Sequence, residues 1–132
     1  MLFRSTVPTG PALVVANEFL DALPIRQLER TADGWGERCV TNNGSGTFAL
    51  TTRPCDAAIG RDAPRGAIRE QSPAIVAFVS ALAARLAREG GAALLIDYGY
   101  AKPALGDTLQ AVHAHRYHPV LDRKSTRLNS SH

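Results

Sequence analysis

Apolar residues in the first part of the chain form one short continuous run, followed by looser alternation. Residues 11–17 are almost entirely apolar and include two adjacent valines, which predicts a strand buried on both faces. Residues 25–31 and 35–41 then alternate loosely, and an Asn-Gly turn signal at 42–46 precedes another such stretch at 47–52. This pattern predicts an antiparallel hairpin or meander.

The second half of the chain carries a helical repeat. Residues 53–66 contain two prolines and two glycines and are expected to form a loop. Ser72 and Pro73 then give an N-cap and first-turn signal, and two glycines at 90–91 give a stop signal. Apolar residues recur at helical spacing between them, at Ile75, Val79, Leu82 and Leu86. The pattern predicts a helix over 73–89, followed directly by a second buried strand over 92–96.

The order of these elements predicts an α/β fold. A strand, an antiparallel excursion, a helix and a second strand make a crossover, so the strands at 11–17 and 92–96 are expected to be parallel. In open α/β sheets, ligands bind in the crevice outside the carboxyl ends of the strands. Both predicted strands end in acidic residues, and the candidate site is expected there.

Asn17, Glu18 and Asp21 directly follow the first of these strands, with Pro24 beyond them. One amide and two carboxylates at this position can line the floor of a pocket. A structural role fits the same residues, with Asn17 ending the strand and Glu18 or Asp21 capping a short helical turn. The residues themselves leave both interpretations open.

Asp97, Tyr98 and Gly99 follow the second strand. Because glycine permits unusual backbone dihedrals, a carboxylate that precedes a glycine turn can approach a ligand closely. The alternative is an ordinary solvated acid in a loop. The predicted parallel geometry favours the ligand-binding interpretation.

Metal-binding chemistry is not predicted. His113, His115 and His118 lie close in sequence, and alternation would put the first two on one face of a strand, but no acidic or cysteine ligand stands at a suitable spacing near them. Surface or core histidines are the expected outcome. Cys39 and Cys55 show no Cys-x-x-Cys spacing, so we expect two reduced, half-buried thiols.

Composition narrows the class of protein. The chain has 132 residues, 45% hydrophobic and 20% charged, with a formal net charge of +3, which allows one soluble domain or part of one. Its 13 arginines and two lysines are scattered, so no nucleic-acid partner is predicted. No stretch is long and apolar enough for a membrane span, no secretory signal is visible, and we expect a cytoplasmic protein. Phosphate-binding glycine loops and the nucleophile elbow are missing.

Residues 122–132 differ from the rest of the chain. They are polar and aperiodic, and residue for residue they resemble the in-frame translation of a common sequencing-library adapter. We expect this tail to be non-native and disordered. Without it, the chain would carry a net charge of only +1, because the tail holds three basic residues and one acidic residue.

Several motifs occur in an order typical of one enzyme family. They lie at 16–24, 34–40, 70–73, 90–99 and 107–110, with His115 beyond them. On these motifs, residues 8–121 resemble the MidA family of S-adenosylmethionine-dependent methyltransferases, whose mitochondrial member is an arginine methyltransferase of complex I assembly. Several motifs in one order are more specific than any single motif.

The resemblance implies a partial Rossmann-like class I methyltransferase sheet. Residues 13–17 would be its fourth strand and 92–97 its fifth, with the helix between them. Residues 1–121 would then be a fragment of the methyltransferase domain, with an antiparallel β-hairpin inserted at about 25–66. The family's Gly-rich cofactor loop is expected upstream of Met1, so the isolated chain is expected to be inactive.

The resemblance also implies methyl transfer from S-adenosylmethionine to a protein arginine. A guanidinium stays protonated and offers five donors, so its site needs carboxylates that fix its plane. The candidates are a catalytic pair, Glu18 and Asp21, a cofactor contact, Asn17, and a substrate-binding group, Asp97, Tyr98 and Gly99. The implied partner is a protein substrate such as a complex I subunit, in the mitochondrial matrix for eukaryotic relatives. The alternative is a non-enzymatic module that holds a protein partner in the hairpin and crevice.

Overall fold

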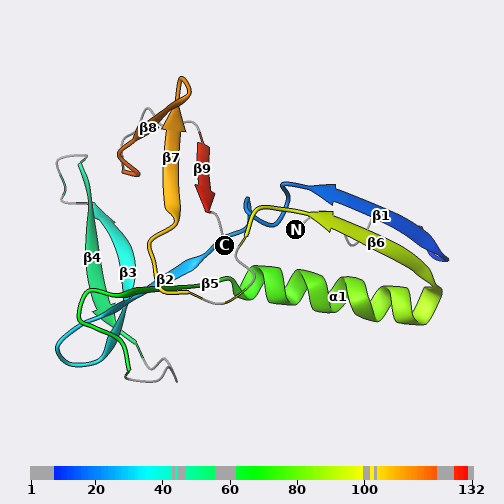
Figure 1. Cartoon of the computed structure of the whole chain (residues 1–132), viewed down its shortest axis with the longest axis horizontal. Coiled ribbons are helices and arrows are strands. Elements are labelled where there is room, and N and C mark those ends of the chain that lie inside the picture. Colours follow the sequence, from blue (N-terminus) through cyan, green and yellow to red (C-terminus); the bar gives the residue numbers. More distant parts are fainter. Residues whose placement is uncertain are drawn as a thin grey trace.

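The computed structural model describes residues 8–42, 44, 47–55, 62–99, 102, 104–121 and 127–130. These residues form one helix and nine strands, arranged in three separate sheets. The helix and the two-stranded sheet form an elongated unit on one side of the molecule, and the other two sheets lie beyond one end of it (Figure 1).

The predicted parallel pair is confirmed. β1 (Ala12–Asn17) pairs with β6 (Gly91–Ile96) in parallel, in a register that runs from Ala12 opposite Gly91 to Asn17 opposite Ile96. The helix α1 (Pro73–Glu89) runs along one face of this pair (Figure 1). The chain therefore forms the expected α/β crossover, and both strands end at the same edge of the unit.

The helix begins and ends where the sequence predicts. The Ser72 hydroxyl accepts a hydrogen bond from the N–H of Ile75 at 3.2 Å, and Pro73 occupies the first turn. At the other end the N–H of Gly90 donates to the Leu86 carbonyl at 2.8 Å, with Gly90 at a φ of 82°. Only glycine adopts this φ without strain, which explains the sharp stop.

The C-terminal end of α1 is tied to the start of β1. The Glu89 carboxylate accepts the Gly10 N–H at 3.0 Å, and the Arg85 guanidinium donates to the carbonyls of Pro8 and Gly10. The Arg88 side chain, and then the Gly10 N–H, hold the pKa of Glu89 below its ordinary value. These contacts set the position of the first strand along the helix.

The middle of the chain forms a four-stranded antiparallel sheet where the sequence predicted an inserted hairpin. Its strands are β2 (Arg26–Arg30), β3 (Trp35–Asn42), β4 (Phe48–Pro54) and β5 (Ile68–Gln71), in the order β4-β3-β2-β5. The sequence pattern missed β5 because Ile68 is its one apolar residue. Tertiary pairing with β2, with Leu28 opposite Arg69, makes it a strand.

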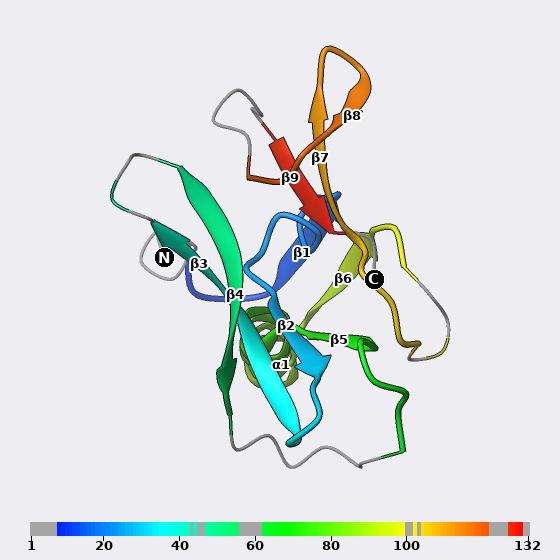
Figure 2. The same cartoon turned by 90° about the vertical axis from the view of Figure 1, so that its left-hand side faces the viewer.

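This antiparallel sheet contains most of the buried core. Leu28 is 0% exposed, and Trp35 and Gln27 are also buried. Viewed from its own side, the sheet lies across the N-terminal end of α1 (Figure 2). Cys39 and Cys55 are free and half-buried in this region, as expected.

The third sheet joins β7 (Leu109–His113), β8 (Arg116–His118) and β9 (Arg127–Ser130) in the order β8-β7-β9. The expected alternation at the histidines is wrong: β7 ends at His113, and His115 lies in the turn with a φ of 59°. Two residues with positive φ, Ala114 and His115, reverse the chain there, so the strand pattern cannot continue through them.

The tail, which the sequence predicts to be disordered, contributes one strand to this sheet. Backbone groups of Arg127–Ser130 pair with β7 from Leu109 opposite Ser130 to Val112 opposite Arg127. The open edge of β7 offers unpaired N–H and C=O groups, which supply partners for this segment. Its resemblance to an adapter translation stays a prediction, and residues 122–126 and 131–132 lie outside the described residues.

Within the described residues, no helix has the length and apolar character needed to cross a membrane.

Candidate functional site

The carboxyl ends of β1 and β6 bring the two predicted groups of polar residues together. Asn17 lies opposite Ile96 in the parallel register. The Glu18 N–H donates to the Ile96 carbonyl at 2.9 Å and so continues the pairing by one residue. Asn17, Glu18 and Asp97 therefore lie at one edge of the sheet, as the sequence analysis expected.

Glu18 has an unusual backbone conformation at this edge. Its φ is 49°, in the left-handed region that costs a non-glycine residue about 1–2 kcal/mol. Its side chain is exposed, as is that of Asn17. The conformation turns the chain out of the strand and leaves the Glu18 carboxylate accessible to solvent.

Asp97 fixes the segment that follows Glu18. One carboxylate oxygen, Oδ2, accepts the N–H of Leu20 at 2.7 Å, and the other, Oδ1, accepts the N–H of Tyr98 at 3.1 Å. Asp97 is half-buried, whereas Tyr98 is 68% exposed and Gly99 is exposed. Both Asp97 oxygens thus hold backbone groups.

The segment after β1 is also anchored to the helix. The rings of Phe19 and Phe78 lie 4.9 Å apart between centroids, in a tilted arrangement. The Ser72 hydroxyl, which caps α1, donates to the Pro24 carbonyl at 2.9 Å. Residues 18–24 are therefore held by β6 on one side and by α1 on the other.

The two proposed catalytic carboxylates differ in exposure. Asp21 is 8% exposed, whereas Glu18 is exposed. The sequence does not distinguish the exposure of these two acids. Burial at the turn depends on how residues 18–24 pack, and such packing has no periodic pattern in the sequence.

A second polar cluster joins the antiparallel sheet to the segment before β7, and its residues are not among the predicted site residues. The Gln27 side-chain amide donates to Glu70 at 2.6 Å and to Asp107 at 2.7 Å, and Arg38 donates to Asp107 at 2.6 Å. Glu70 in turn accepts the N–H of Thr108 at 3.0 Å. Gln27, Arg38, Glu70, Asp107 and Thr108 thus connect β2, β3 and β5 to the start of β7.

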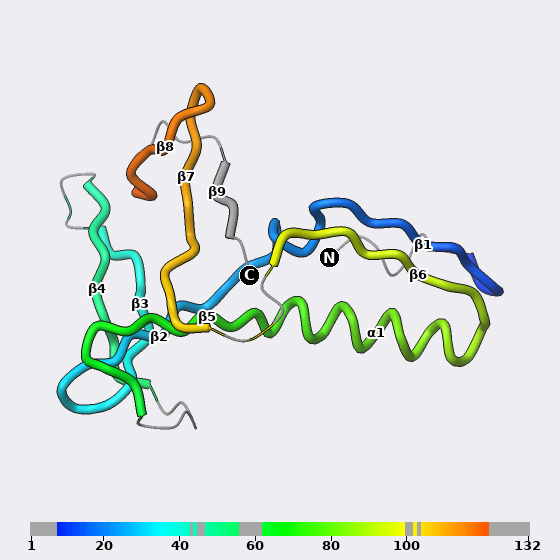
Figure 3. The backbone as a smooth tube through the Cα atoms, in the orientation of Figure 1, coloured from blue at the N-terminus to red at the C-terminus, as the bar shows by residue number. Residues whose placement is uncertain are grey.

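Backbone contact reinforces this connection. Figure 3 shows the segment before β7 running beside β5, where the Gly106 N–H donates to the Ile68 carbonyl at 2.8 Å. Burial alone would raise the pKa of Asp107, but hydrogen bonds from Arg38 and Gln27 outweigh it and lower that pKa. Arg38, Glu70 and Asp107 each lie in a motif on which the family resemblance rests. These motifs are the sequence signal from which the cluster could have been predicted.

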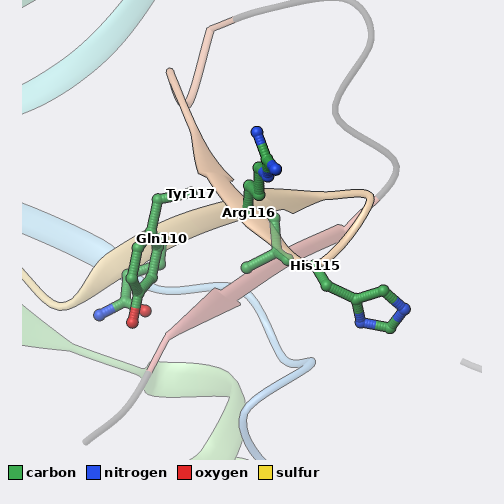
Figure 4. Close-up of a pocket in the computed structure, with 5 residues that line it drawn as sticks. Gln110, His115, Arg116 and Tyr117 are labelled. Carbon is green, nitrogen blue, oxygen red and sulfur yellow. The ribbon is translucent and has the colours of Figure 1, made fainter.

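A hollow on the β7–β8 hairpin is separate from both clusters. Its lining residues are Gln110, Val112, His115, Arg116 and Tyr117. Figure 4 shows His115 pointing away from Gln110 and Tyr117, so these polar groups do not converge on one point. Across the described part of the chain, no group of three or more histidine, cysteine or acidic residues is arranged to hold a metal ion.

Comparisons with known proteins identify the family. Residues 3–126 match the family model of S-adenosyl-L-methionine-dependent methyltransferases. The chain is 38% identical over 123 residues to protein arginine methyltransferase NDUFAF7, mitochondrial, of Danio rerio, and 32% identical over 121 residues to the Homo sapiens protein of that name. The matches cover 88% and 87% of this chain, but only 29% and 27% of those relatives.

Solved structures agree with this result. An uncharacterized protein of Burkholderia thailandensis, solved by crystallography, matches with a TM-score of 0.76 and 31% identity, over 95% of this chain and 37% of that one. A second crystal structure from this organism, bound to S-adenosyl-homocysteine, matches with a TM-score of 0.71 and 30% identity, over 96% of this chain and 36% of that one. The chain therefore belongs to the family of S-adenosyl-L-methionine-dependent methyltransferases.

Proposed function

We propose that this chain carries part of the substrate side of a protein arginine methyltransferase site, at the carboxyl ends of β1 and β6. The observation that carries the proposal is Glu18: an exposed carboxylate at a strand end, on a backbone turned out of the strand at a φ of 49°. Unfavourable backbone conformations of this kind gather at functional sites.

Glu18 has the chemistry that an arginine substrate needs. A guanidinium stays charged at neutral pH, and its planar fork of donors matches the two oxygens of a carboxylate. We propose that Glu18 accepts hydrogen bonds from the guanidinium and fixes its plane. Holding the substrate nitrogen in one orientation supports methyl transfer, because such transfer requires a defined approach of the reacting atoms.

We propose a different role for Asp21, which does not contact the substrate. It is 8% exposed, so we propose that it adds negative charge within the turn, while Glu18 meets the substrate directly. That charge favours a cationic guanidinium nearby and is screened less by water than an exposed charge would be.

The polar residues at the carboxyl ends of β1 and β6 have the chemistry to contact S-adenosylmethionine, the cofactor of the family. S-adenosylmethionine is cationic at its sulfonium and supplies the methyl group when bound. Asn17 and Glu18 offer an exposed amide and an exposed carboxylate, which suit polar and cationic atoms of such a molecule. We propose Asn17 as the cofactor contact, and Tyr98 and Gly99 as substrate contacts beside it.

Other parts of the proposal come from the resemblance to the family. One such part is a complex I subunit as the methylated protein. A cytoplasmic location, which was expected from the residues and not from the resemblance, is also proposed, although the relatives above are named as mitochondrial. We also propose that the isolated chain neither binds S-adenosylmethionine tightly nor transfers methyl groups, because the parallel sheet has only two strands in the described residues. Calorimetric titration with S-adenosylmethionine checks this, and tight stoichiometric binding would contradict it.

The test of the site uses a chimera in which residues 8–121 replace the aligned segment of the Danio rerio relative. We expect the chimera to methylate an arginine-containing protein substrate, and Glu18→Gln to lower kcat/KM by about a hundredfold, since a charged hydrogen-bond partner of the substrate is lost. Radiolabelled methyl transfer to that substrate measures both values. Asp33→Asn, an exposed acid in the β2–β3 turn, is the matched control.

Two results contradict the proposal. One is a folded chimera without methyl transfer, and the other is a Glu18→Gln chimera with unchanged kcat/KM. An independent measurement uses the 132-residue chain itself, titrated with an arginine-containing peptide and observed by NMR. Amide shifts centred on Glu18 support the proposal, and shifts confined to other elements oppose it.

A further inference from the structure

Asp97 makes contacts that differ from those of a substrate ligand. Each of its carboxylate oxygens already accepts a backbone hydrogen bond, from Leu20 at 2.7 Å and from Tyr98 at 3.1 Å. The Leu20 contact joins residues 77 positions apart in the chain. A hydrogen bond from a backbone N–H to an ionised carboxylate is among the stronger kinds in proteins.

The Leu20 contact lies next to the backbone turn at Glu18. Glu18 is bound on its N-terminal side through its own N–H, which donates to Ile96 at 2.9 Å. Leu20, two residues later, is bound by the side chain of Asp97. The left-handed Glu18 therefore lies between two points that are both fixed by the end of β6.

Such a conformation persists only when its surroundings hold it. The left-handed backbone costs Glu18 free energy, and the two contacts from β6 offset that cost. Removing the Asp97 carboxylate would remove the second of these two contacts, and the turn could then relax toward an ordinary backbone. The Glu18 carboxylate would move with it.

We infer that Asp97 is a positioning residue of the methyltransferase site, which acts on catalysis by fixing the turn that carries Glu18. This inference rests on the proposed function of Glu18 and changes the role of Asp97 from substrate binding to positioning. Because Asp97 touches backbone groups only in the described contacts, its loss should impair orientation of the bound substrate more than binding itself.

The first test examines the contact without any activity assay. Amide hydrogen exchange is followed by NMR in the full 132-residue chain and in its Asp97→Asn variant. We expect exchange at Leu20 to rise by about tenfold or more in the variant, while amides of β2 and β3 keep their rates. Asp33→Asn should leave Leu20 unchanged. Unchanged exchange at Leu20 in Asp97→Asn would overturn the inference.

The second test measures the consequence in the chimera described above. We expect Asp97→Asn to lower kcat by about tenfold and Asp97→Ala by about a hundredfold, with KM for the protein substrate changed by less than about twofold. Asparagine keeps one acceptor oxygen and should therefore preserve more activity than alanine. A rise in KM at constant kcat would make Asp97 a substrate ligand and overturn the inference, as would an unchanged kcat.

The two tests separate this inference from the proposed function. If Glu18→Gln leaves methyl transfer unchanged, the proposed role of Glu18 fails, whatever Leu20 exchange shows. If Glu18→Gln impairs transfer and Asp97→Asn does not, only the positioning role fails.

Discussion

The antiparallel sheet and the β1–α1–β6 unit place their apolar side chains in opposite ways. In the antiparallel sheet, Leu28 and Trp35 are buried. In the parallel pair, Leu13 is 85% exposed, Val15 72% and Leu94 57%. In the parallel register, Val15 pairs with Leu94, and Leu13 and Val15 lie two positions apart on β1. All three therefore belong to one face of the pair, which we call the uncovered face, and α1 covers the other.

In the described structure, the buried apolar core and the candidate site therefore lie in different regions. Parallel sheets are normally covered on both faces, so the uncovered face contributes little hydrophobic stabilisation here. The candidate site residues Asn17, Glu18 and Asp97 nevertheless belong to this unit. The antiparallel sheet supplies buried apolar surface but none of the proposed site residues. The candidate site therefore depends on local hydrogen bonds at the end of β6 more than on a core beneath it.

The largest expected effect comes from removing the most buried side chain of the antiparallel sheet. Leu28→Ala should lower the free energy of unfolding by about 2–5 kcal/mol, because it deletes buried methyl groups and leaves a cavity. Leu94→Ser, on the uncovered face, should change it by less than about 0.5 kcal/mol. Urea unfolding of both variants measures the difference, and equal losses of unfolding free energy would contradict a core confined to the antiparallel sheet.

A smaller but more local effect is expected at the start of β6. Gly91 has a φ of 116°, and a Cβ added there would lie 1.9 Å from the Ala12 carbonyl oxygen. Gly91→Ala should therefore cost about 3 kcal/mol in the β1–β6 pair. Hydrogen exchange should show faster exchange in β1 and β6 but unchanged protection in β2 and β3.

Two glycines serve as controls for this variant. Gly10 also has a positive φ, of 108°, but has nothing within 4 Å of an added Cβ, so Gly10→Ala isolates the backbone strain. Gly106 has neither a positive φ nor a close neighbour, so Gly106→Ala should be nearly neutral. A Gly91→Ala effect no larger than that of Gly10→Ala would show that the close approach of β1 and β6 is unimportant.

The smallest effect is a pH dependence at Asp107, in the cluster that joins the antiparallel sheet to β7. Its pKa is lowered in the folded protein, so its stabilising contribution is present above its unfolded value, about 3.9, and is lost as the pH falls through the folded value. We expect Asp107→Asn to lose less than about 1 kcal/mol at neutral pH, because the carboxylate is 45% exposed.

Urea unfolding between about pH 2 and pH 7 checks this sign. The gap in the free energy of unfolding between the unmutated chain and Asp107→Asn should narrow toward the acid end, as Asp107 loses its negative charge. A gap that stays constant across this range would contradict a lowered pKa. Asp33→Asn should show no such narrowing.

Local sequence signals predicted the elements that depend on neighbouring residues. The Ser72 cap, the helical repeat after it and the glycine stop placed α1 at its observed bounds. The continuous apolar runs predicted β1 and β6 and their parallel pairing. Strand-end position also brought Asn17, Glu18 and Asp97 to one edge, while their roles stay proposals.

Elements without a local signal required the tertiary structure. β5 has a single apolar residue, Ile68, and becomes a strand through pairing with β2. The turn at His115 ends the alternation that the sequence suggested. β9 lies in a segment that was expected to be disordered, and it forms there because the edge of β7 supplies hydrogen-bond partners.

The α/β crossover, the helix bounds and the methyltransferase resemblance could be predicted from the sequence, because periodicity, capping and motif order are local properties of the chain. Three features depend on the folded arrangement. Asp97 binds Leu20, Glu18 is exposed while Asp21 is buried, and Gln27, Arg38 and Asp107 form one cluster. These contacts join residues far apart in the chain, and their free energy depends on distances and burial that a linear pattern does not contain.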